Sequence, residues 1–293
     1  MKATGADLHH RAERLAASLP PLMVAAKRVA STVAQGVHGR RRVGQGETFW
    51  QFRRYQPGDS APRVDWRQSA KSTHLYIRET EWEAAQSVWL WRDASASMDY
   101  ASAPALGPKR RRAELLLLAL SVLLVRGGER VAVLGSGLRP TAGRVVLTRI
   151  AHMIEDGEPA TGSLPVPEAL PRHARVVLIG DFLSPLPEIK DAIAAFDALG
   201  VRGHMVQVLD PAEETLPFAG RVRFVGPEAE GFALIGRAET AAGDYARAMA
   251  AHQAEIGLLA RSAGWSFVRH RTDRSPEAAL LALYLGLAEP APA

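Results

Sequence analysis

Residues 88–97, with the sequence Val-Trp-Leu-Trp-Arg-Asp-Ala-Ser-Ala-Ser, join a short apolar run to a polar loop that begins at Asp93. Residues 176–181, Val-Val-Leu-Ile-Gly-Asp, repeat this arrangement and place Asp181 directly after the run. Short apolar runs bounded by polar residues are typical of strands buried on both faces of a parallel sheet. We therefore expect two buried strands that each deliver an aspartate to the carboxyl edge of one sheet.

The chain around these runs alternates between strand-like and helix-like segments. Predicted strands lie at Val88 to Trp91, Val131 to Leu134, Val176 to Ile179, His204 to Leu209 and Ser266 to Arg269. Predicted helices lie at Arg110 to Val125, Leu186 to Leu199, Tyr245 to Ser262 and Pro276 to Leu287. This alternation predicts an α/β fold with a doubly wound, mostly parallel, six-stranded sheet.

Two smaller parts precede the α/β region. Residues 1–35 carry apolar side chains at helical spacings, interrupted by Pro20 and Pro21, and predict an N-terminal helical segment. Residues 36–85 are richer in aromatic and β-branched residues, with a predicted strand at Leu75 to Glu79. We interpret them as a small β-rich segment.

The α/β domain is expected to span residues 86–288, with an insertion at about 211–244. Within that insertion, Val222 to Val225 and Phe232 to Ile235 predict a hairpin. The Pro/Ala-rich residues 289–293 predict a disordered tail.

The composition is that of a folded protein without a membrane span. Of the 293 residues, 47% are hydrophobic and 23% are charged, which argues against a wholly disordered, collagenous or coiled-coil chain. The absence of cysteine excludes disulfides, thiolate metal sites and cysteine nucleophiles. The apolar runs are shorter than the roughly 20 residues that cross a bilayer, and the N-terminus lacks a signal-peptide core. We expect a cytoplasmic protein.

The charge balance is mildly basic, at +5 from 36 basic and 31 acidic residues. Basic runs at Arg40 to Arg42 and Lys109 to Arg112 could touch a phosphate backbone or an acidic protein face. The alternative is a solvated surface with pairing inside the molecule. Aromatic residues are not interleaved with these runs, so we do not expect a nucleic-acid partner.

Asp93, Ser95 and Ser97 alternate along their loop, and extended backbone would project all three side chains to one side. If Asp93 and Asp181 converge to about 6 Å, their repulsion is on the order of 3 kcal/mol at an effective dielectric of about 20. A bound cation would reverse that cost, and oxygen-only ligands select Mg²⁺, Mn²⁺ or Ca²⁺. On spacing alone, an alternative stays open in which these residues cap the helices that follow.

The pattern Asp93-x-Ser95-x-Ser97-Met98, with Asp181 after a later strand, resembles the metal-ion-dependent adhesion site of von Willebrand factor type A domains. Other stretches resemble the signature of the Domain of Unknown Function 58 family: Arg54-Tyr55-Gln56-Pro57-Gly58-Asp59, Arg63-Val64-Asp65-Trp66, Ser69-Ala70-Lys71-Ser72 and Asp210-Pro211-Ala212-Glu213. The likeness covers roughly residues 36–287. Members of that family contain a von Willebrand type A-like domain and are often encoded beside MoxR-type AAA ATPases.

The resemblance implies a metal site with Mg²⁺ as the expected ion and Mn²⁺ or Ca²⁺ as alternatives. Its ligands would be Asp93, Ser95, Ser97, Thr161 and Asp181. Thr141 and Thr148 are poorer candidates for the threonine. Phe182 stands where adhesion domains usually have glycine, and Pro62 stands where the family commonly has an arginine.

The upstream signature is interpreted as structural or partner-binding. Its residues are Arg54, Tyr55, Gly58, Asp59, Arg63, Asp65 and Trp66. Proline followed by glycine at 57–58 suits a tight turn. The charged members are expected to form an ion network, with Trp66 packed over it, that docks the β-rich segment onto the sheet.

The resemblance implies a metal-dependent protein–protein interaction module and not an enzyme. It would work with a MoxR-type AAA ATPase in chaperone-like assembly or maturation of a client protein, by capturing an acidic side chain of a partner. The sequence has no GxSxG, GxxxxGK[ST], HExxH or GxGxxG motif, and no catalytic residue is assigned. The alternative is a metal-assisted hydrolase or phosphatase that uses Asp93 and Asp181.

Overall fold

The computed structural model describes residues 21–36, 43–56, 59, 64–81, 86–156, 162–228 and 230–288. The chain divides into two compact units. One is Gln35–Gln86, and the other consists of Met1–Ala34 together with Ser87–Ala293. The predicted disordered tail at 289–293 and most of the predicted N-terminal helical segment, residues 1–20, lie outside the described residues.

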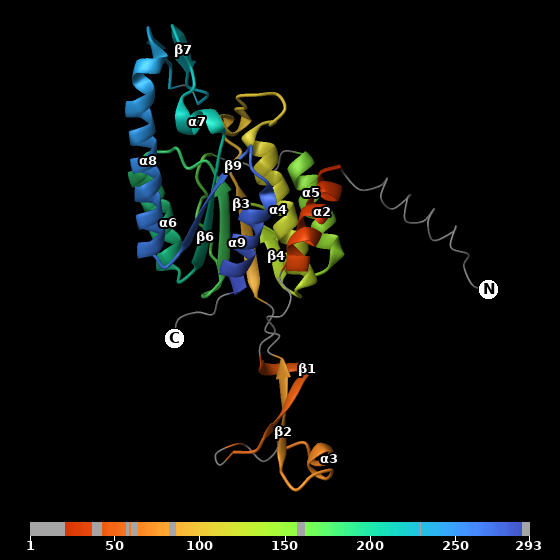
Figure 1. Ribbon diagram of the computed structural model, residues 1–293. Coiled ribbons are helices and arrows are strands. Elements are labelled where there is room, and N and C mark those ends of the chain that lie inside the picture. Colours follow the sequence, from red (N-terminus) through yellow and green to blue (C-terminus); the bar gives the residue numbers. More distant parts are fainter. Residues whose placement is uncertain are drawn as a thin grey trace, which may run out of the picture. The chain divides into compact units, whose positions relative to one another are not determined.

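The larger unit is built on a parallel sheet (Figure 1). Its strands are β3 (Ser87–Arg92), β4 (Arg130–Val133), β5 (Arg175–Gly180), β6 (Arg202–Leu209) and β9 (Ser266–Arg271). They follow the order β4-β3-β5-β6-β9, and every neighbouring pair is parallel. The parallel α/β prediction is confirmed. The count of six strands was wrong, because the described residues form a central sheet of five.

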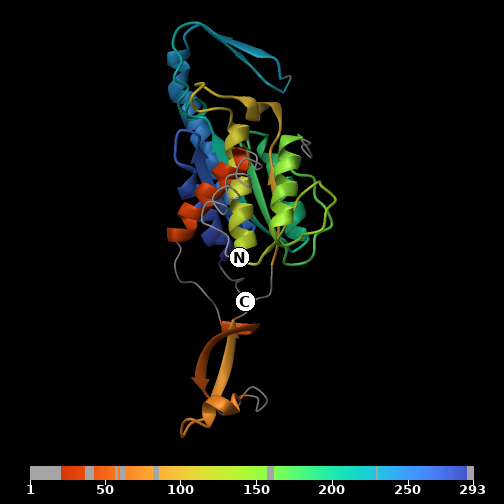
Figure 2. The ribbon, with the colours of Figure 1, turned by 90° about the vertical axis from the view of Figure 1, so that its right-hand side faces the viewer.

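Helices cover both faces of the sheet, as the doubly wound prediction requires (Figures 1 and 2). One face carries α4 (Lys109–Arg126), α5 (Arg144–Glu155) and α9 (Pro276–Ala288), and the other carries α6 (Leu186–Ala198) and α8 (Ala238–Ser262). A further helix, α2 (Pro21–Gly36), lies on the α4 side and buries Met23, Ala26, Ala30 and Val33. Their spacing of three and four residues is that of one helix face.

The core on the α6 and α8 side depends on large side chains from adjacent strands. Trp89 and Trp91 of β3 belong to one buried cluster with Phe196 and Trp265. Gly203 on β6 makes room for this cluster, because a Cβ there would lie 1.9 Å from the Trp265 ring. Burial on both faces explains why β3 and β5 are continuous apolar runs.

The predicted hairpin is confirmed as β7 (Val222–Val225) paired antiparallel with β8 (Phe232–Ile235). It follows the short helix α7 (Pro211–Thr215) and precedes α8, which begins earlier than the predicted Tyr245. In Figure 1 the hairpin lies at the end of the unit to which α7 and the start of α8 also belong. No helix in the described part of the chain combines the length and apolarity needed to cross a membrane.

The smaller unit contains β1 (Val43–Arg54) paired antiparallel with β2 (Tyr76–Glu81), and the helix α3 (Trp66–Ser69). Asp65 begins α3, and its Oδ1 accepts a 2.8 Å hydrogen bond from the Gln68 amide. Ile77 is fully buried. The strand predicted at Leu75 to Glu79 corresponds to β2.

Candidate functional site

Asp93 and Asp181 lie at the point where the strand order of the sheet reverses. From β3 the chain continues to β4 on one side and then to β5 on the other. The crevice at the carboxyl ends of two such strands is where open α/β sheets bind ligands. Asp93 follows β3 and Asp181 follows β5, so the strand order alone places both aspartates at this crevice.

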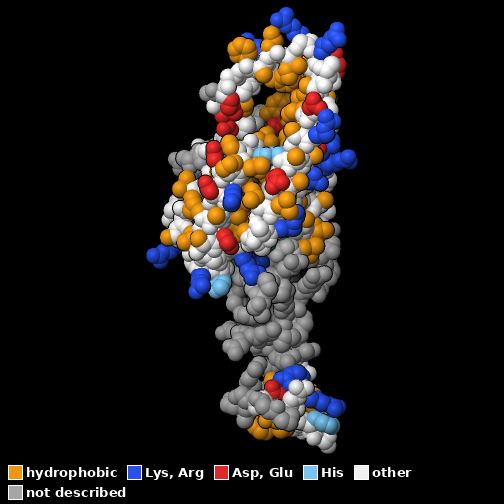
Figure 3. Space-filling model, turned by 90° about the vertical axis from the view of Figure 1, so that its left-hand side faces the viewer, with side chains coloured by type: hydrophobic (Ala, Val, Ile, Leu, Met, Phe, Trp, Pro, Cys, Tyr) orange, Lys and Arg blue, Asp and Glu red, His pale blue; other side chains and the backbone are white. Residues whose placement is uncertain are grey.

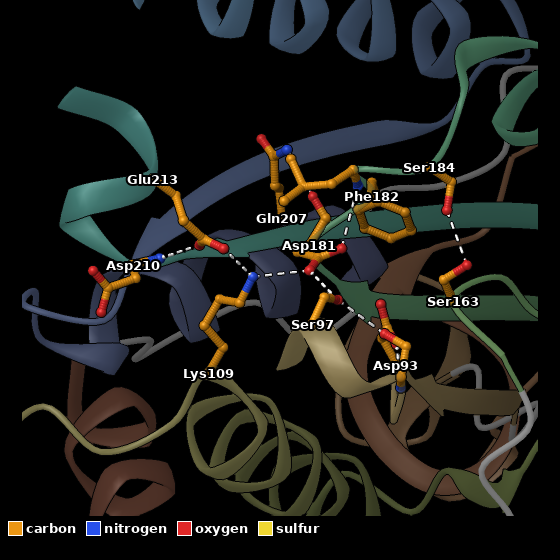
Figure 4. A network of polar contacts seen from close by, with 12 residues as sticks. Asp93, Ser97, Lys109, Ser163, Asp181, Phe182, Ser184, Gln207, Asp210 and Glu213 are labelled. Carbon is orange, nitrogen blue, oxygen red and sulfur yellow. Dashed lines mark hydrogen bonds and ion pairs between the residues drawn. The ribbon is translucent and has the colours of Figure 1, made fainter. Parts of the chain in front are cut away.

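A chain of short hydrogen bonds connects the two aspartates (Figure 4). Asp93 Oδ1 accepts from Ser95 Oγ at 2.6 Å, and Ser95 Oγ lies 3.0 Å from Ser97 Oγ. Ser97 Oγ donates to Asp181 Oδ2 at 2.6 Å. The structure therefore brings four of the five predicted metal-site residues together. The fifth, Thr161, lies outside the described residues.

Asp93 is fully buried, and among the described residues its Oδ2 has no hydrogen-bond partner. Burial raises the pKa of Asp93 to about 7, and the negative charge of Asp181 adds to the effect. Gly180 packs against this carboxylate, since a Cβ there would lie 2.8 Å from Asp93 Cβ and 3.2 Å from Oδ2. A buried carboxylate oxygen without a donor is costly unless a proton or a cation reaches it.

Lys109, the first residue of α4, supplies a cation inside the site. Its Nζ donates to Asp181 Oδ2 at 2.8 Å and to Glu213 Oε1 at 2.5 Å, and the side chain is fully buried. Figure 4 shows Lys109 between Glu213 and Asp181. Burial by itself would lower the pKa of Lys109, but the two carboxylates outweigh it and raise the pKa. Lys109 therefore stays charged.

Glu213 also fixes the start of α7. Its Oε2 accepts from the Asp210 amide at 2.8 Å, while Asp210 Oδ1 accepts from the Ala212 amide at 2.9 Å, which completes a capping box. The motif Asp210-Pro211-Ala212-Glu213 is thus a helix start that holds Glu213 beside Lys109. Sequence reasoning missed both partners, although the Asp-x-x-Glu spacing is a recognisable signal for a capping box.

The basic run at Lys109 to Arg112 is paired inside the molecule, as the alternative interpretation held. Besides Lys109, Arg110 pairs with Asp99 at 2.7 Å. Arg112 donates to the carbonyl of Thr272 at 2.7 Å. The other run, Arg40 to Arg42, lies outside the described residues.

Helix capping does not account for the aspartates. Asp181 Oδ1 accepts from the Leu183 amide at 3.2 Å, but α6 begins only at Leu186. Ser95 precedes the 3-10 helix η2 (Ala96–Asp99) without capping it through its side chain. Asp93 Oδ1 does bind the Ser95 amide, at 2.8 Å, and so orders the loop. That contact leaves Asp93 Oδ2 unexplained.

Phe182 occupies the position where the sequence departs from adhesion domains. Its φ of 49° lies in the left-handed region that favours glycine. The ring is fully buried in the core cluster, and His252 Nε2 lies 2.8 Å from the Phe182 carbonyl oxygen. Ring burial of this extent outweighs a backbone cost of about 1 kcal/mol.

The residues present fit a hard divalent cation. All the predicted ligand atoms are oxygens, one of them is a buried carboxylate oxygen without a donor, and the three carboxylates face a single ammonium group. Within the described ranges there is no group of three or more histidine, cysteine or acidic side chains with metal-site geometry. An ion here would therefore depend on serine hydroxyls and water to complete its coordination.

Other hydroxyls near the site belong to Ser163 and Ser184, which lie 2.9 Å apart and line the same cavity as Ser97 and Asp181. The poorer threonine candidates lie elsewhere. Thr141 pairs through its backbone with Val131, and Thr148 is exposed on α5.

The predicted ion network of the upstream signature takes a different form. Asp59 pairs with Arg53 at 2.9 Å, and not with Arg54, and its Oδ2 closes a turn by accepting from the Gln56 amide at 2.8 Å. Asp65 caps α3. Trp66 is 65% exposed, so its predicted packing over the network was wrong. Tyr55 is exposed as well, and Gly58 and Arg63 lie outside the described residues.

Fold and site together define the class of protein: a doubly wound α/β domain with an oxygen-lined crevice at its topological switch point. Residues 51–255 match the family described as "Protein of unknown function DUF58". The chain belongs to the DUF58 family.

Curated relatives share most of the chain. Uncharacterized protein Rv1480 of Mycobacterium tuberculosis is 32% identical over 279 residues, which cover 89% of this chain and 86% of the relative. Uncharacterized protein Mb1516 of Mycobacterium bovis matches to the same extent. Among solved structures, an aerotolerance-related membrane protein from Bacteroides fragilis is 16% identical with a TM-score of 0.43, covering 69% of this chain and 98% of that one.

Proposed function

We propose that this protein is a metal-dependent protein–protein interaction module. A divalent cation, Mg²⁺ first and Mn²⁺ or Ca²⁺ next, would be held by Asp93, Ser95, Ser97 and Asp181, with Thr161 as a further ligand. The observation that carries the proposal is Asp93 Oδ2, a buried carboxylate oxygen without a donor in the described part of the chain, at the crevice of the sheet. When bound, Mg²⁺ presents exchangeable positions that accept a carboxylate oxygen of a partner.

Charge supports a divalent ion. When Asp93, Asp181 and Glu213 are ionised, their three negative charges face the one positive charge of Lys109, which leaves a net charge of −2. A proton on Asp93 removes only one of these charges. A divalent cation removes both, which is the balance that a buried site favours.

The chain's own residues divide the work. Asp93 is buried and would anchor the ion from below, whereas Ser97 and Asp181 line a cavity that a partner can enter. Without the ion, the cavity floor carries Asp181 and Glu213 and repels a carboxylate. Capture of an acidic side chain would therefore require the ion.

The partner we propose is a MoxR-type AAA ATPase, in chaperone-like assembly or maturation of a client protein. Support for this partner comes from the family resemblance of the signature motifs. The cytoplasmic location and the absence of enzymatic activity also stay predictions.

Two measurements test the proposal. Calorimetric titration of the metal-free protein with Mg²⁺ should show binding in the wild type and in Asp99→Asn, a change on the same loop at an exposed aspartate. It should show none in Asp93→Asn or Asp181→Asn. Equal binding in Asp93→Asn would reject the metal site.

The second measurement is retention of the same organism's MoxR-type ATPase on the immobilised protein, in Mg²⁺ and in EDTA. Retention should be lost in EDTA and in Asp93→Asn. Retention that persists under both conditions would reject the metal-bridged mechanism, and turnover of p-nitrophenyl phosphate that disappears in Asp181→Asn would favour the hydrolase alternative.

A further inference from the structure

A cavity of about 990 Å³ lies between the carboxyl edge of the sheet and the β7–β8 hairpin. Figure 3 shows the opening, with hydrophobic and acidic side chains around it. Ser97, Asp181 and Glu213 line it from the sheet side. Its volume is at the upper end of the roughly 300–1,000 Å³ that ligand-binding cavities occupy.

The hairpin contributes an apolar wall. Val222, Phe224, Ala233 and Ile235 line the cavity, and the Phe224 ring is held edge-on against Phe218, with ring centroids 5.6 Å apart. Leu234, which alternates with Ala233 and Ile235 on β8, does not line the cavity and is 51% exposed. An isolated two-stranded hairpin is marginally stable, so an apolar wall facing a void of this size would gain stability from an occupant.

The charged residues of the cavity are almost all acidic. Glu188, Glu228 and Glu230 line it in addition to Asp181 and Glu213. Arg223 is the only lysine or arginine among the described lining residues, and its guanidinium lies 4.2 Å from the centroid of the Phe232 ring, away from Ala233 and Ile235 in the β8 alternation. The field in the cavity therefore favours a cationic group.

We propose that this cavity binds a protein segment that carries an apolar side chain next to a lysine or arginine. The apolar side chain packs against Phe218 and Phe224, and the cation is paired by Glu188 and Glu228. An apolar anchor in a pocket with a charged rim is the arrangement that concentrates binding energy at protein interfaces. The inference rests on the proposed function only in taking the partner to be a protein, because these contacts need no metal ion.

A displayed library of random nine-residue peptides, selected on the immobilised full chain, tests this inference. Lysine or arginine beside leucine, isoleucine, phenylalanine or tryptophan should be enriched. For an enriched peptide, Phe224→Ser should weaken binding about tenfold or more, because it removes the apolar anchor. The double variant Glu188→Gln and Glu228→Gln should weaken it similarly while leaving the hairpin's apolar contacts in place. Leu234→Ser, on the same hairpin but outside the cavity, should leave affinity unchanged.

The outcomes separate this inference from the proposed function. Enrichment of acidic peptides, no enrichment, or equal losses in Phe224→Ser and Leu234→Ser would overturn it. Peptide binding that needs Phe224 and Glu228 but is indifferent to EDTA, combined with no Mg²⁺ binding, would sustain the inference and reject the metal-dependent function. Mg²⁺-dependent retention of the ATPase that is indifferent to Phe224→Ser and to the double glutamine variant would do the reverse.

Discussion

Lys109 Nζ lies 2.8 Å from Asp181 Oδ2, and both side chains are buried at the carboxyl edge of the sheet. The same ammonium group contacts Glu213 at 2.5 Å, so one lysine connects the start of α4, the end of β5 and the helix α7. A buried carboxylate pair held by one cation is stable only while the cation is present.

Replacing Lys109 by methionine should lower the free energy of unfolding by about 3–5 kcal/mol, because Asp181 and Glu213 lose their shared partner inside the protein. Urea denaturation at pH 8 measures this change. The matched control is Arg247→Met, which breaks the exposed pair between Arg247 and Asp244 and should cost less than about 1 kcal/mol. Equal, small effects of the two changes would contradict a structural role for Lys109.

The raised pKa of Asp93 predicts a pH dependence of stability in metal-free protein. The folded chain keeps a proton on Asp93 up to about pH 7, whereas the unfolded chain releases it near pH 3.8. The folded state therefore binds more protons in that window, and the free energy of unfolding falls as pH rises from about 4 to 7, by up to about 4 kcal/mol.

Asp93→Asn should remove this decrease and stabilise the protein at pH 8, whereas Asp99→Asn should keep it. Urea denaturation in EDTA from pH 4 to pH 8 measures both. A variant whose profile matches that of the wild type would refute the assignment.

Mg²⁺ binding should weaken at acid pH, because the ion must displace the proton from Asp93. With a pKa of about 7, the ionised fraction of Asp93 is about tenfold smaller at pH 6 than at pH 8, so the affinity should fall about tenfold. Calorimetric titration at the two pH values measures the ratio. An affinity that is the same at both would mean that Asp93 is not a ligand.

Gly180→Ala should disturb the site without removing any ligand. The new methyl group would meet Asp93 Cβ at 2.8 Å and force that carboxylate to move. We expect Mg²⁺ affinity to fall about tenfold or more, as it does when a residue that positions a ligand is changed. Gly243→Ala, in an open position on α8, is the control and should leave Mg²⁺ affinity unchanged. Unaltered affinity in Gly180→Ala would show that Asp93 is free to shift.

The sequence was sufficient to predict the strands and the convergence of the aspartates. Continuous apolar runs mark strands that are buried on both faces, and polar residues directly after them fall at one sheet edge. For that reason Asp93 and Asp181 could be placed together although they are far apart in the chain.

Lys109 could not be predicted in the same way. A lysine in a basic run is usually solvated, and its burial depends on Glu213, whose position is set by a capping box in the distant helix α7. The left-handed backbone of Phe182 was equally inaccessible, because it reflects a balance between ring burial and backbone strain. Trp66 was misjudged because aromatic residues are buried on average, and only the fold reveals an exception.

The β7–β8 hairpin is inserted in the connection between β6 and β9, and the two ends of that insertion are bound to each other. The Ala238 amide donates to the Gly220 carbonyl at 2.9 Å, and Glu239 accepts from the Gly220 amide at 2.8 Å. A segment closed at its own base can be lengthened, shortened or exchanged as a module while the scaffold beneath it is conserved. Grafting this flap between family members should therefore transplant partner choice and leave the ion-binding crevice unaltered.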